Sequence, residues 1–289
     1  MKIDRRVLKA RAREAMGQTQ PRFWAVALVY ILLTTGVQIA LSLLLSALPG
    51  GTSGIFLNIL FFLYSTVILF GLRLWSLWAW RKLDPGMGAL TQGFSIPGRV
   101  ILMELFIFVR VFGWALLFIL ALSIFALPLS AVLAASPILY LPYAGALYVL
   151  IWVFMLRYNM APYLLADRPD DGPSLAIRRS VEMMRGRKWE LFKLQLSFLG
   201  WEAINWVLSL AVFFFLCAQA GLFQMSVGLD SLLLYQSVAN GLVNVALSGL
   251  VTLPLSLWLL PYQEVAQAGF YEEIRQAGPA PGAPEMPPL

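Results

Sequence analysis

The first long apolar stretch of the chain is FWAVALVYILLTTGVQIALSLLLSAL, from Phe23 to Leu48, in which 26 residues pass without a charged side chain. A helix of about 20 apolar residues is long enough to span the hydrocarbon core of a bilayer. The runs near 55–80, 100–127, 138–163, 193–217 and 232–261 are similarly long and apolar. They are continuously apolar and do not alternate, which is typical of helices and not of barrel strands. The sequence therefore predicts an all-α, polytopic membrane helical bundle with six transmembrane helices.

The composition of the chain agrees with this prediction. Of its 289 residues, 60% are hydrophobic and only 12% are charged, which is unusual for a soluble domain. The apolar stretch that begins at Phe23 is longer than the roughly 7 to 15 apolar residues of a secretory signal peptide. We therefore expect it to remain in the protein as a membrane anchor.

The positions of the basic residues predict how the chain is oriented. Residues 1–22 carry seven Lys and Arg, and residues 164–193 carry another seven. The loops at 49–54, 128–137 and 218–231 carry none. Because basic loops stay on the cytoplasmic side, this pattern predicts a multi-pass protein of the inner (cytoplasmic) membrane with both termini in the cytoplasm. The basic segment 1–22, the segment 164–192 and the tail 262–289 would then be cytoplasmic, with the tail disordered after about residue 277.

The same distribution bears on the partners of the protein. The formal net charge is +6, but the basic residues lie beside the ends of the spans. Orientation and contact with anionic lipids of the inner leaflet account for basic residues in such places. We therefore expect membrane lipids as partners, allow for a protein partner at the cytoplasmic face, and expect no binding to nucleic acid.

Three of the polar segments share a pattern. The stretches 7–16, 87–92 and 174–185 each have the spacing of a short amphipathic helix, and each is followed by a glycine, a basic residue and an outward-going span. A threefold repeat of helix hairpins is one organisation that fits this pattern, although the spacing between the three units is unequal. The third stretch is the most amphipathic, and a basic amphipathic helix of this kind lies at the membrane interface or binds a partner.

Three sequence stretches resemble a known family. They are FMLRYNMAPYLLADRPD at 154–170, SVEMMRGRKWELFKLQLSFLGW at 180–201 and PYQEVAQAGFYEEI at 261–274. Their order and spacing resemble the bacterial membrane-protein family catalogued as domain of unknown function 975. The resemblance covers the carboxy-terminal half and is carried by Tyr158, Asp167, Pro169, Ser180, Met183, Met184, Gly186, Lys188, Phe192, Ser197, Phe198, Gly200, Trp201, Pro261, Tyr262, Phe270 and Tyr271. It implies a multi-pass bacterial inner-membrane protein and supplies no activity.

Five charged residues lie inside the predicted spans: Arg73, Arg110, Arg157, Glu104 and Glu202. A charge near the bilayer centre costs about 2.5 to 3.5 kcal/mol on insertion scales, so such residues are usually paired or hydrated. One interpretation is that they form fixed ion pairs, with Glu202 paired to Arg110 or Arg157. The other is a pocket open to the cytoplasm, in which three arginines against two glutamates attract an anionic solute or a lipid headgroup.

The residues that the sequence lacks limit the chemistry. The chain has no histidine and a single cysteine, Cys217, so a Ser-His-Asp relay and a disulfide within the chain are excluded. We therefore expect no enzyme activity, no metal site and no cofactor. The sequence favours a non-enzymatic accessory, scaffold or regulatory membrane protein that acts through its cytoplasmic face. The alternative is a transporter or lipid-handling protein that uses the Arg/Glu pocket.

Overall fold

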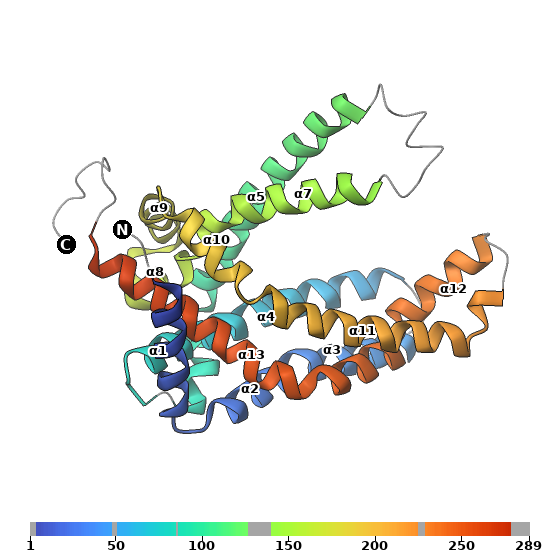
Figure 1. Cartoon of the computed structure of the whole chain (residues 1–289), viewed down its shortest axis with the longest axis horizontal. Coiled ribbons are helices and arrows are strands. Elements are labelled where there is room, and N and C mark those ends of the chain that lie inside the picture. The colour runs from blue at the N-terminus through green and yellow to red at the C-terminus, as the bar shows by residue number, and fades with distance from the viewer. Residues whose placement is uncertain (1–3, 48–50, 85, 127–139, 225–228, 279–289) are drawn as a thin grey trace. The chain divides into compact units, whose positions relative to one another are not determined.

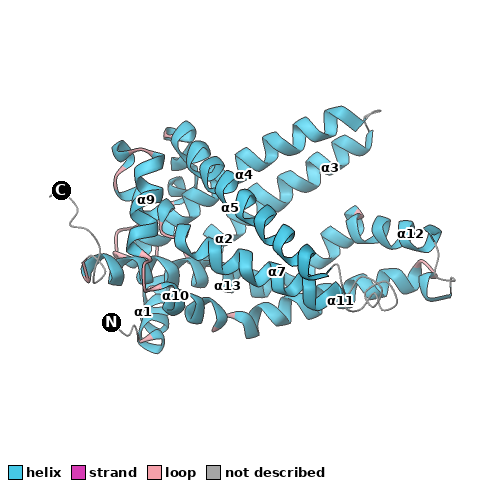
Figure 2. Cartoon of the chain, turned by 90° about the horizontal axis from the view of Figure 1, so that it is seen from above, coloured by secondary structure: helices cyan, strands magenta, loops and turns pink. Residues whose placement is uncertain are grey.

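The computed structural model describes residues 4–47, 51–84, 86–126, 140–224 and 229–278, and within these ranges all regular secondary structure is helical (Figure 2). Six of the helical segments are long and apolar enough to cross a membrane. The structure thus confirms the all-α fold with six apolar spans. The spans are Phe23–Leu45, Gly54–Trp80, Pro97–Ala121, Ala144–Asp167, Leu199–Gln219 and Leu242–Gln276.

The described residues form two compact units. Unit 1 contains Phe94–Leu194 and the chain from Phe270 onward, and unit 2 contains Asp4–Gly93 and Gln195–Gly269. The helices of unit 1 are α5 (Pro97–Ala126), α7 (Tyr140–Met155), α8 (Ala161–Asp167), α9 (Pro173–Met183) and most of α10 (Lys188–Leu196). Those of unit 2 are α1 (Arg5–Gly17), α2 (Phe23–Ile31), α3 (Val37–Ala47), α4 (Gly51–Trp80), α11 (Leu199–Gln219), α12 (Leu229–Asn240) and most of α13 (Leu242–Gln276).

Unit 1 is built around the long helix α5 (Figure 1). Helix α7 packs against α5, and α9 packs against both α5 and α8. The rings of Trp114 on α5 and Phe154 on α7 lie 5.0 Å apart between centroids. A short 3-10 turn, Leu156–Tyr158, separates α7 from α8, and another, Pro169–Asp171, leads into α9. Helix α9 therefore lies beside the spanning helices of its unit and buries its apolar face, including Ala176 and Ile177, against them.

In unit 2, the amino-terminal helix α1 forms where the basic segment was predicted to be amphipathic. Asp4 caps it, because its carboxylate accepts a hydrogen bond from the backbone N–H of Arg6 at 2.9 Å. The buried face of α1 consists of Leu8, Ala12, Ala15 and Met16, which follow the three- and four-residue spacing of an amphipathic helix. The segment is thus a packed helix and not a loose basic tail.

The first span of unit 2 is locally wound as a π-helix. Residues Leu32–Gly36, with the sequence LLTTG, form the π-helical segment η1 between α2 and α3. The hydroxyl of Thr34 donates to the carbonyl of Tyr30 at 2.8 Å, and such bonds compete with the regular helical ladder. Gly36 and the β-branched Thr34 and Thr35 also favour the α-helix only weakly. The sequence therefore explains why the winding changes here.

The second predicted amphipathic helix is a 3-10 helix, η2 (Met87–Ser95), and differs in this from α1 and α9. It lies very close to α4. A Cβ atom added to Gly71 would be 2.1 Å from the carbonyl oxygen of Leu90, and one added to Gly93 would be 2.6 Å from that of Val67. Only glycine permits this backbone approach, so the two glycines fix the contact between η2 and α4.

The carboxy-terminal spans differ from the predicted bounds. The chain breaks its helix around Phe198, so that Lys193 belongs to α10 and not to the fifth span. Gly241 separates α12 from α13 within the predicted span 232–261. Helix α13 then runs past its internal Pro254 and Pro261 to Gln276, because helices of membrane proteins tolerate proline. The predicted disorder after about residue 277 falls almost wholly outside the described residues.

Candidate functional site

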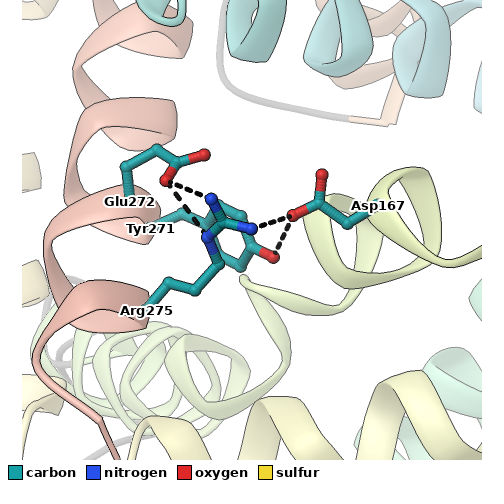
Figure 3. Close-up of polar contacts among 4 residues, drawn as sticks. All are labelled: Asp167, Tyr271, Glu272 and Arg275. Carbon is teal, nitrogen blue, oxygen red and sulfur yellow. Dashed lines mark hydrogen bonds and ion pairs between the residues drawn. The ribbon is translucent and has the colours of Figure 1, made fainter. Parts of the chain in front are cut away.

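A cluster of polar side chains connects the end of α8 to the end of α13 in unit 1 (Figure 3). The carboxylate of Asp167 accepts a hydrogen bond from the hydroxyl of Tyr271 at 2.7 Å. The same oxygen lies 3.5 Å from the guanidinium of Arg275, which is also 3.0 Å from the carboxylate of Glu272. Arg275 thus lies between two carboxylates, and we call these four residues the Asp167 cluster.

The Asp167 cluster is largely shielded from solvent. Tyr271 is fully buried, and the side chains of Asp167 and Glu272 are 13% and 5% exposed. The ring of Tyr163 stacks on that of Tyr271, with centroids 5.4 Å apart and an angle of 20° between the planes. Hydrogen bonds to charged groups are about twice as strong as neutral ones, so this cluster holds two distant parts of the chain together.

Further polar contacts fix the segment between α8 and α10. Arg99 at the start of α5 donates to the carbonyl of Pro169 at 2.8 Å, and Arg179 forms an ion pair with Asp171. Arg187 donates to the carbonyl of Ile274 at 3.3 Å and to that of Gly278 at 3.0 Å. Arg187 therefore caps the end of α13.

The predicted residue Arg157 lies in the turn between α7 and α8. Its guanidinium is over the ring of Phe154 at 4.5 Å, and its Nε is buried with no hydrogen-bond partner among the described residues. Its carbonyl accepts a hydrogen bond from the buried hydroxyl of Ser180 at 2.9 Å, which ties α9 to this turn. Burial, together with the nearby positive charge of Arg157, lowers the pKa of Lys188. The surroundings of Arg157 are thus positively charged.

The predicted residue Arg110 lines a groove between α5 and α9. The groove has a volume of about 530 Å³ and lies wholly within unit 1. Two guanidinium groups and two hydroxyls line it together with three apolar side chains: Arg110, Arg178, Tyr158, Ser174, Leu175, Ile177 and Val181. Arg178 also lies 3.7 Å from Glu182. Glu104, on the same helix as Arg110, is half-buried.

The other two predicted charges belong to unit 2. Arg73 on α4 lies 4.0 Å from the carboxylate of Glu264 on α13. Glu202 on α11 accepts a hydrogen bond from the side-chain amide of Gln263 at 2.7 Å. The pairing of Glu202 with Arg110 or Arg157 stays a prediction, since those arginines belong to unit 1. Sequence reasoning missed Gln263 and Glu264 because it ended the sixth span at Pro261, although both lie within the next helical turn.

Lys9 connects α1 to residues of the family-like motifs. Its Nζ donates to the carbonyl and hydroxyl of Ser197 at 3.1 and 3.0 Å, and it lies 4.1 Å from the centre of the Phe198 ring. The Phe198 ring contacts that of Tyr262 edge to face, 5.1 Å away. Burial, with the charges of Arg13 and Arg5, lowers the pKa of Lys9. The contact is a cation–π interaction strengthened by partial burial.

Most of the family-like positions are packing or turn residues. Tyr158, Ser180, Met184, Phe198, Tyr262, Phe270 and Tyr271 are buried. Gly186 has a φ of 74°, a left-handed conformation that favours glycine, and it forms the turn between α9 and α10. Trp201, by contrast, is 43% exposed and contacts Trp258 edge to face at 5.3 Å. The family-like positions therefore serve mainly to pack the ends of the spans and to form the turns between helices.

The fold and these clusters define a polytopic α-helical membrane protein whose polar residues gather at the ends of apolar helices. A family model described as "Protein of unknown function (DUF975)" matches residues 3–278, and the chain belongs to this family. The match includes the amino-terminal half, in addition to the carboxy-terminal half that carries the motifs quoted above. Neither the curated proteins nor the solved structures contain a match to the chain.

Proposed function

We propose that this protein is a non-enzymatic membrane scaffold or regulatory protein that acts through its cytoplasmic face. The observation that carries the proposal is the Asp167 cluster, which holds the segment after α8 to the end of α13 by hydrogen bonds and ion pairs. A segment that served only to connect two spans would not need such a network. We infer that the network maintains one surface conformation.

The surface held in this way exposes groups suited to a protein partner. Asp170 is 99% exposed, the side chain of Arg178 is 72% exposed, and Trp189 is 63% exposed. The ring of Trp189 stacks on that of Phe192 with centroids 5.0 Å apart, so it is held in place while exposed. Tryptophan and arginine are enriched among the residues that dominate binding energy at protein interfaces.

Photocrosslinking in native membranes tests this proposal. A photoreactive amino acid at position 178 or 189 is expected to give one discrete protein adduct. The same residue at Tyr148, which is 66% exposed on the spanning helix α7, is expected to give none. The Asp167→Asn change should abolish the adduct by freeing the segment. Adducts that are equally strong at position 148, or that survive Asp167→Asn, would contradict the proposal.

The proposed orientation has its own test. The native Cys217 is fully buried and should stay unlabelled, so a cysteine introduced at position 178 is a clean probe. A membrane-impermeant maleimide should label Arg178→Cys only after the membrane is opened. Labelling of this variant in intact cells would place the face on the other side.

The groove beside Arg110 favours a second function, the binding of anionic lipid headgroups. Basic pockets beside membrane helices on the cytoplasmic side bind such headgroups, and guanidinium grips phosphate with two hydrogen bonds. The groove joins two arginines to apolar side chains. Arg110→Gln should weaken the retention of phosphatidylglycerol in native mass spectrometry, whereas Arg22→Gln, an exposed basic residue outside the groove, should not. Equal retention by both variants would count against lipid handling at this groove.

A further inference from the structure

Unit 2 contains a cavity of about 520 Å³ among three of its apolar spans. The first span contributes side chains from Leu28 to Ile39, α11 contributes Glu202 and Asn205, and α13 contributes side chains from Val245 to Gln263. Half of the twenty lining residues are Leu, Ile, Val or Ala. The volume lies within the range of about 300 to 1,000 Å³ that is usual for sites of small organic ligands.

Two hydrogen-bond acceptors on α11, the carboxylate of Glu202 and the carboxamide oxygen of Asn205, line the cavity. Glu202 holds one hydrogen bond, from Gln263 at 2.7 Å, and no ion pair among the described residues. Asn205 lies three residues further along α11, on the same side of the helix, and its buried carboxamide oxygen has no hydrogen-bond partner in the described part of the chain. Buried polar atoms in native proteins nearly always have a partner. The carboxamide oxygen of Asn205 can therefore accept a hydrogen bond from a ligand in the cavity.

The charge of the cavity is negative. None of the described residues that line it is a lysine or an arginine, and Glu202 is the one acidic residue among them. Arg73, a basic residue of the same unit, is paired with Glu264. A carboxylate inside an apolar span is costly unless a positive charge or a proton neutralises it. The arrangement thus complements a cation, whereas the sequence predicted an anionic ligand for a pocket that Glu202 would share with Glu104 and three arginines.

The backbone of the first span is irregular where it lines this cavity. The π-helical segment contributes Leu32, Thr34, Thr35 and Gly36 to the lining. Single turns of π-helix frequently occur at functional sites. The irregular turn adds two threonine residues to the lining, and the hydroxyl of Thr34 donates to the carbonyl of Tyr30. The π-helical turn and the polar side chains of α11 therefore line the same cavity.

The rim of the cavity is apolar and open. Leu32 and Leu250 both line the cavity and are 59% and 67% exposed. They belong to helices that are apolar enough to span a membrane, so this rim faces lipid tails when the protein is in a bilayer. A ligand that enters here must carry an apolar body.

We propose that this cavity binds an amphiphilic organic amine, with its ammonium group at Glu202 and Asn205 and its apolar body among the aliphatic side chains. An ammonium group supplies both what the carboxylate lacks, a positive charge, and what Asn205 lacks, a donor. The inference goes beyond the scaffold function proposed above, because it concerns a different site in the other unit.

Binding of 2-phenylethylamine to the full-length protein in detergent provides the test. Isothermal titration should show saturable binding of this amine, which is protonated at neutral pH. 2-Phenylethanol matches it in shape and partitions into detergent but lacks the charge, and we expect it to bind at least tenfold more weakly. 3-Phenylpropionate, which is an anion, should not bind. Equal binding of amine and alcohol, or tighter binding of the anion, would overturn the proposal.

Variants locate the binding within the cavity. Glu202→Gln keeps the shape and the acceptor oxygen but removes the charge, and it should weaken amine binding about tenfold or more. Asn205→Leu should weaken it severalfold and serves as the second variant if Glu202→Gln does not fold. Glu104→Gln, an intramembrane carboxylate of unit 1, is the matched control and should leave binding unchanged. Binding that is unaffected by both cavity variants, or reduced as much by Glu104→Gln, would refute the assignment.

Discussion

The Asp167 cluster of unit 1 and the cavity of unit 2 differ in how their buried polar groups are paired. In unit 1, the carboxylate of Asp167 meets a hydroxyl and a guanidinium, and the guanidinium meets a second carboxylate (Figure 3). In unit 2, Glu202 and Asn205 line a cavity. Among the residues that the structure describes, the carboxylate of Glu202 accepts one hydrogen bond, from a neutral donor, and the oxygen of Asn205 accepts none. A satisfied network stabilises one arrangement of the chain, whereas unsatisfied groups beside open space are suited to a ligand.

The cavity does not reflect loose packing throughout unit 2. Where η2 meets α4, the backbones approach so closely that only glycine fits at positions 71 and 93. The same unit therefore contains both a tight contact and an open cavity. The Asp167 cluster and the cavity beside Glu202 therefore differ because of their own residues and not because of the unit that contains them. Single substitutions can test each of the two sites.

The largest effect is expected from Gly71→Ala. The new methyl group would lie 2.1 Å from the carbonyl oxygen of Leu90, so η2 must move away from α4. Overpacking of this kind costs about 3 kcal/mol or more when the clash is with backbone. Unfolding in mixed micelles, followed by tryptophan fluorescence, should show this loss. Gly113→Ala inside α5, where nothing lies within 4 Å of the added atom, is the control and should leave stability unchanged or raise it by up to about 1 kcal/mol.

Asp167→Asn should have the next largest effect. It removes the charge that faces Arg275 and weakens the bond to Tyr271, which we expect to cost about 2 kcal/mol in the free energy of unfolding. Asp170→Asn is a matched control, because this carboxylate is 99% exposed and its pair with Arg99 contributes little. Equal losses for the two variants would remove the distinction between a buried network and a surface pair.

Tyr271→Phe should have a smaller effect than Asp167→Asn. It deletes one hydroxyl but keeps the stacking on Tyr163 and leaves Arg275 beside Asp167. We expect a loss of about 1 kcal/mol in the same unfolding assay. Tyr148→Phe, at a position 66% exposed, should give no change. A loss at Tyr271 as large as that at Asp167 would indicate that the hydroxyl, and not the ion pair, holds the cluster.

Asn205→Leu should have the smallest effect and the opposite sign. It replaces a buried oxygen that has no partner by an apolar group of similar size, so the protein should be unchanged or more stable by up to about 1 kcal/mol. Asn244→Leu provides the contrast, because the side-chain amide of Asn244 donates to the carbonyl of Ala239 at 2.9 Å. A clear loss of stability in Asn205→Leu would show that Asn205 has a structural role.

The sequence predicted the spans well because hydropathy reports which residues avoid water. It did not predict the breaks at Phe198 and Gly241 or the π-turn at Leu32–Gly36, because hydropathy does not detect a change of winding inside an apolar run. The sixth span was predicted to end at Pro261, so Gln263 and Glu264 were not counted among the charged and polar residues of the spans. The rule that proline ends a helix is weak where neighbouring helices support the backbone.

The candidate site was predicted in part. Asp167 and Tyr271 were singled out by family resemblance, and the structure brings them together although 104 residues separate them. Nothing in their spacing indicates that contact. The sequence predicted an arginine as the ionic partner of Glu202, because charged residues inside membrane spans are usually paired with an opposite charge. Instead, the one hydrogen bond to its side chain comes from Gln263, and that difference leads to the proposed amine site.

The most direct test measures the thermal unfolding temperature of Asp167→Asn and Glu202→Gln, each with and without 2-phenylethylamine. If the Asp167 cluster is structural and the cavity binds a ligand, Asp167→Asn unfolds at a lower temperature but keeps the rise that the amine produces. Glu202→Gln should unfold at the wild-type temperature and lose that rise. The opposite pattern, in which Glu202→Gln unfolds early and Asp167→Asn loses the response to the amine, would contradict this division of roles.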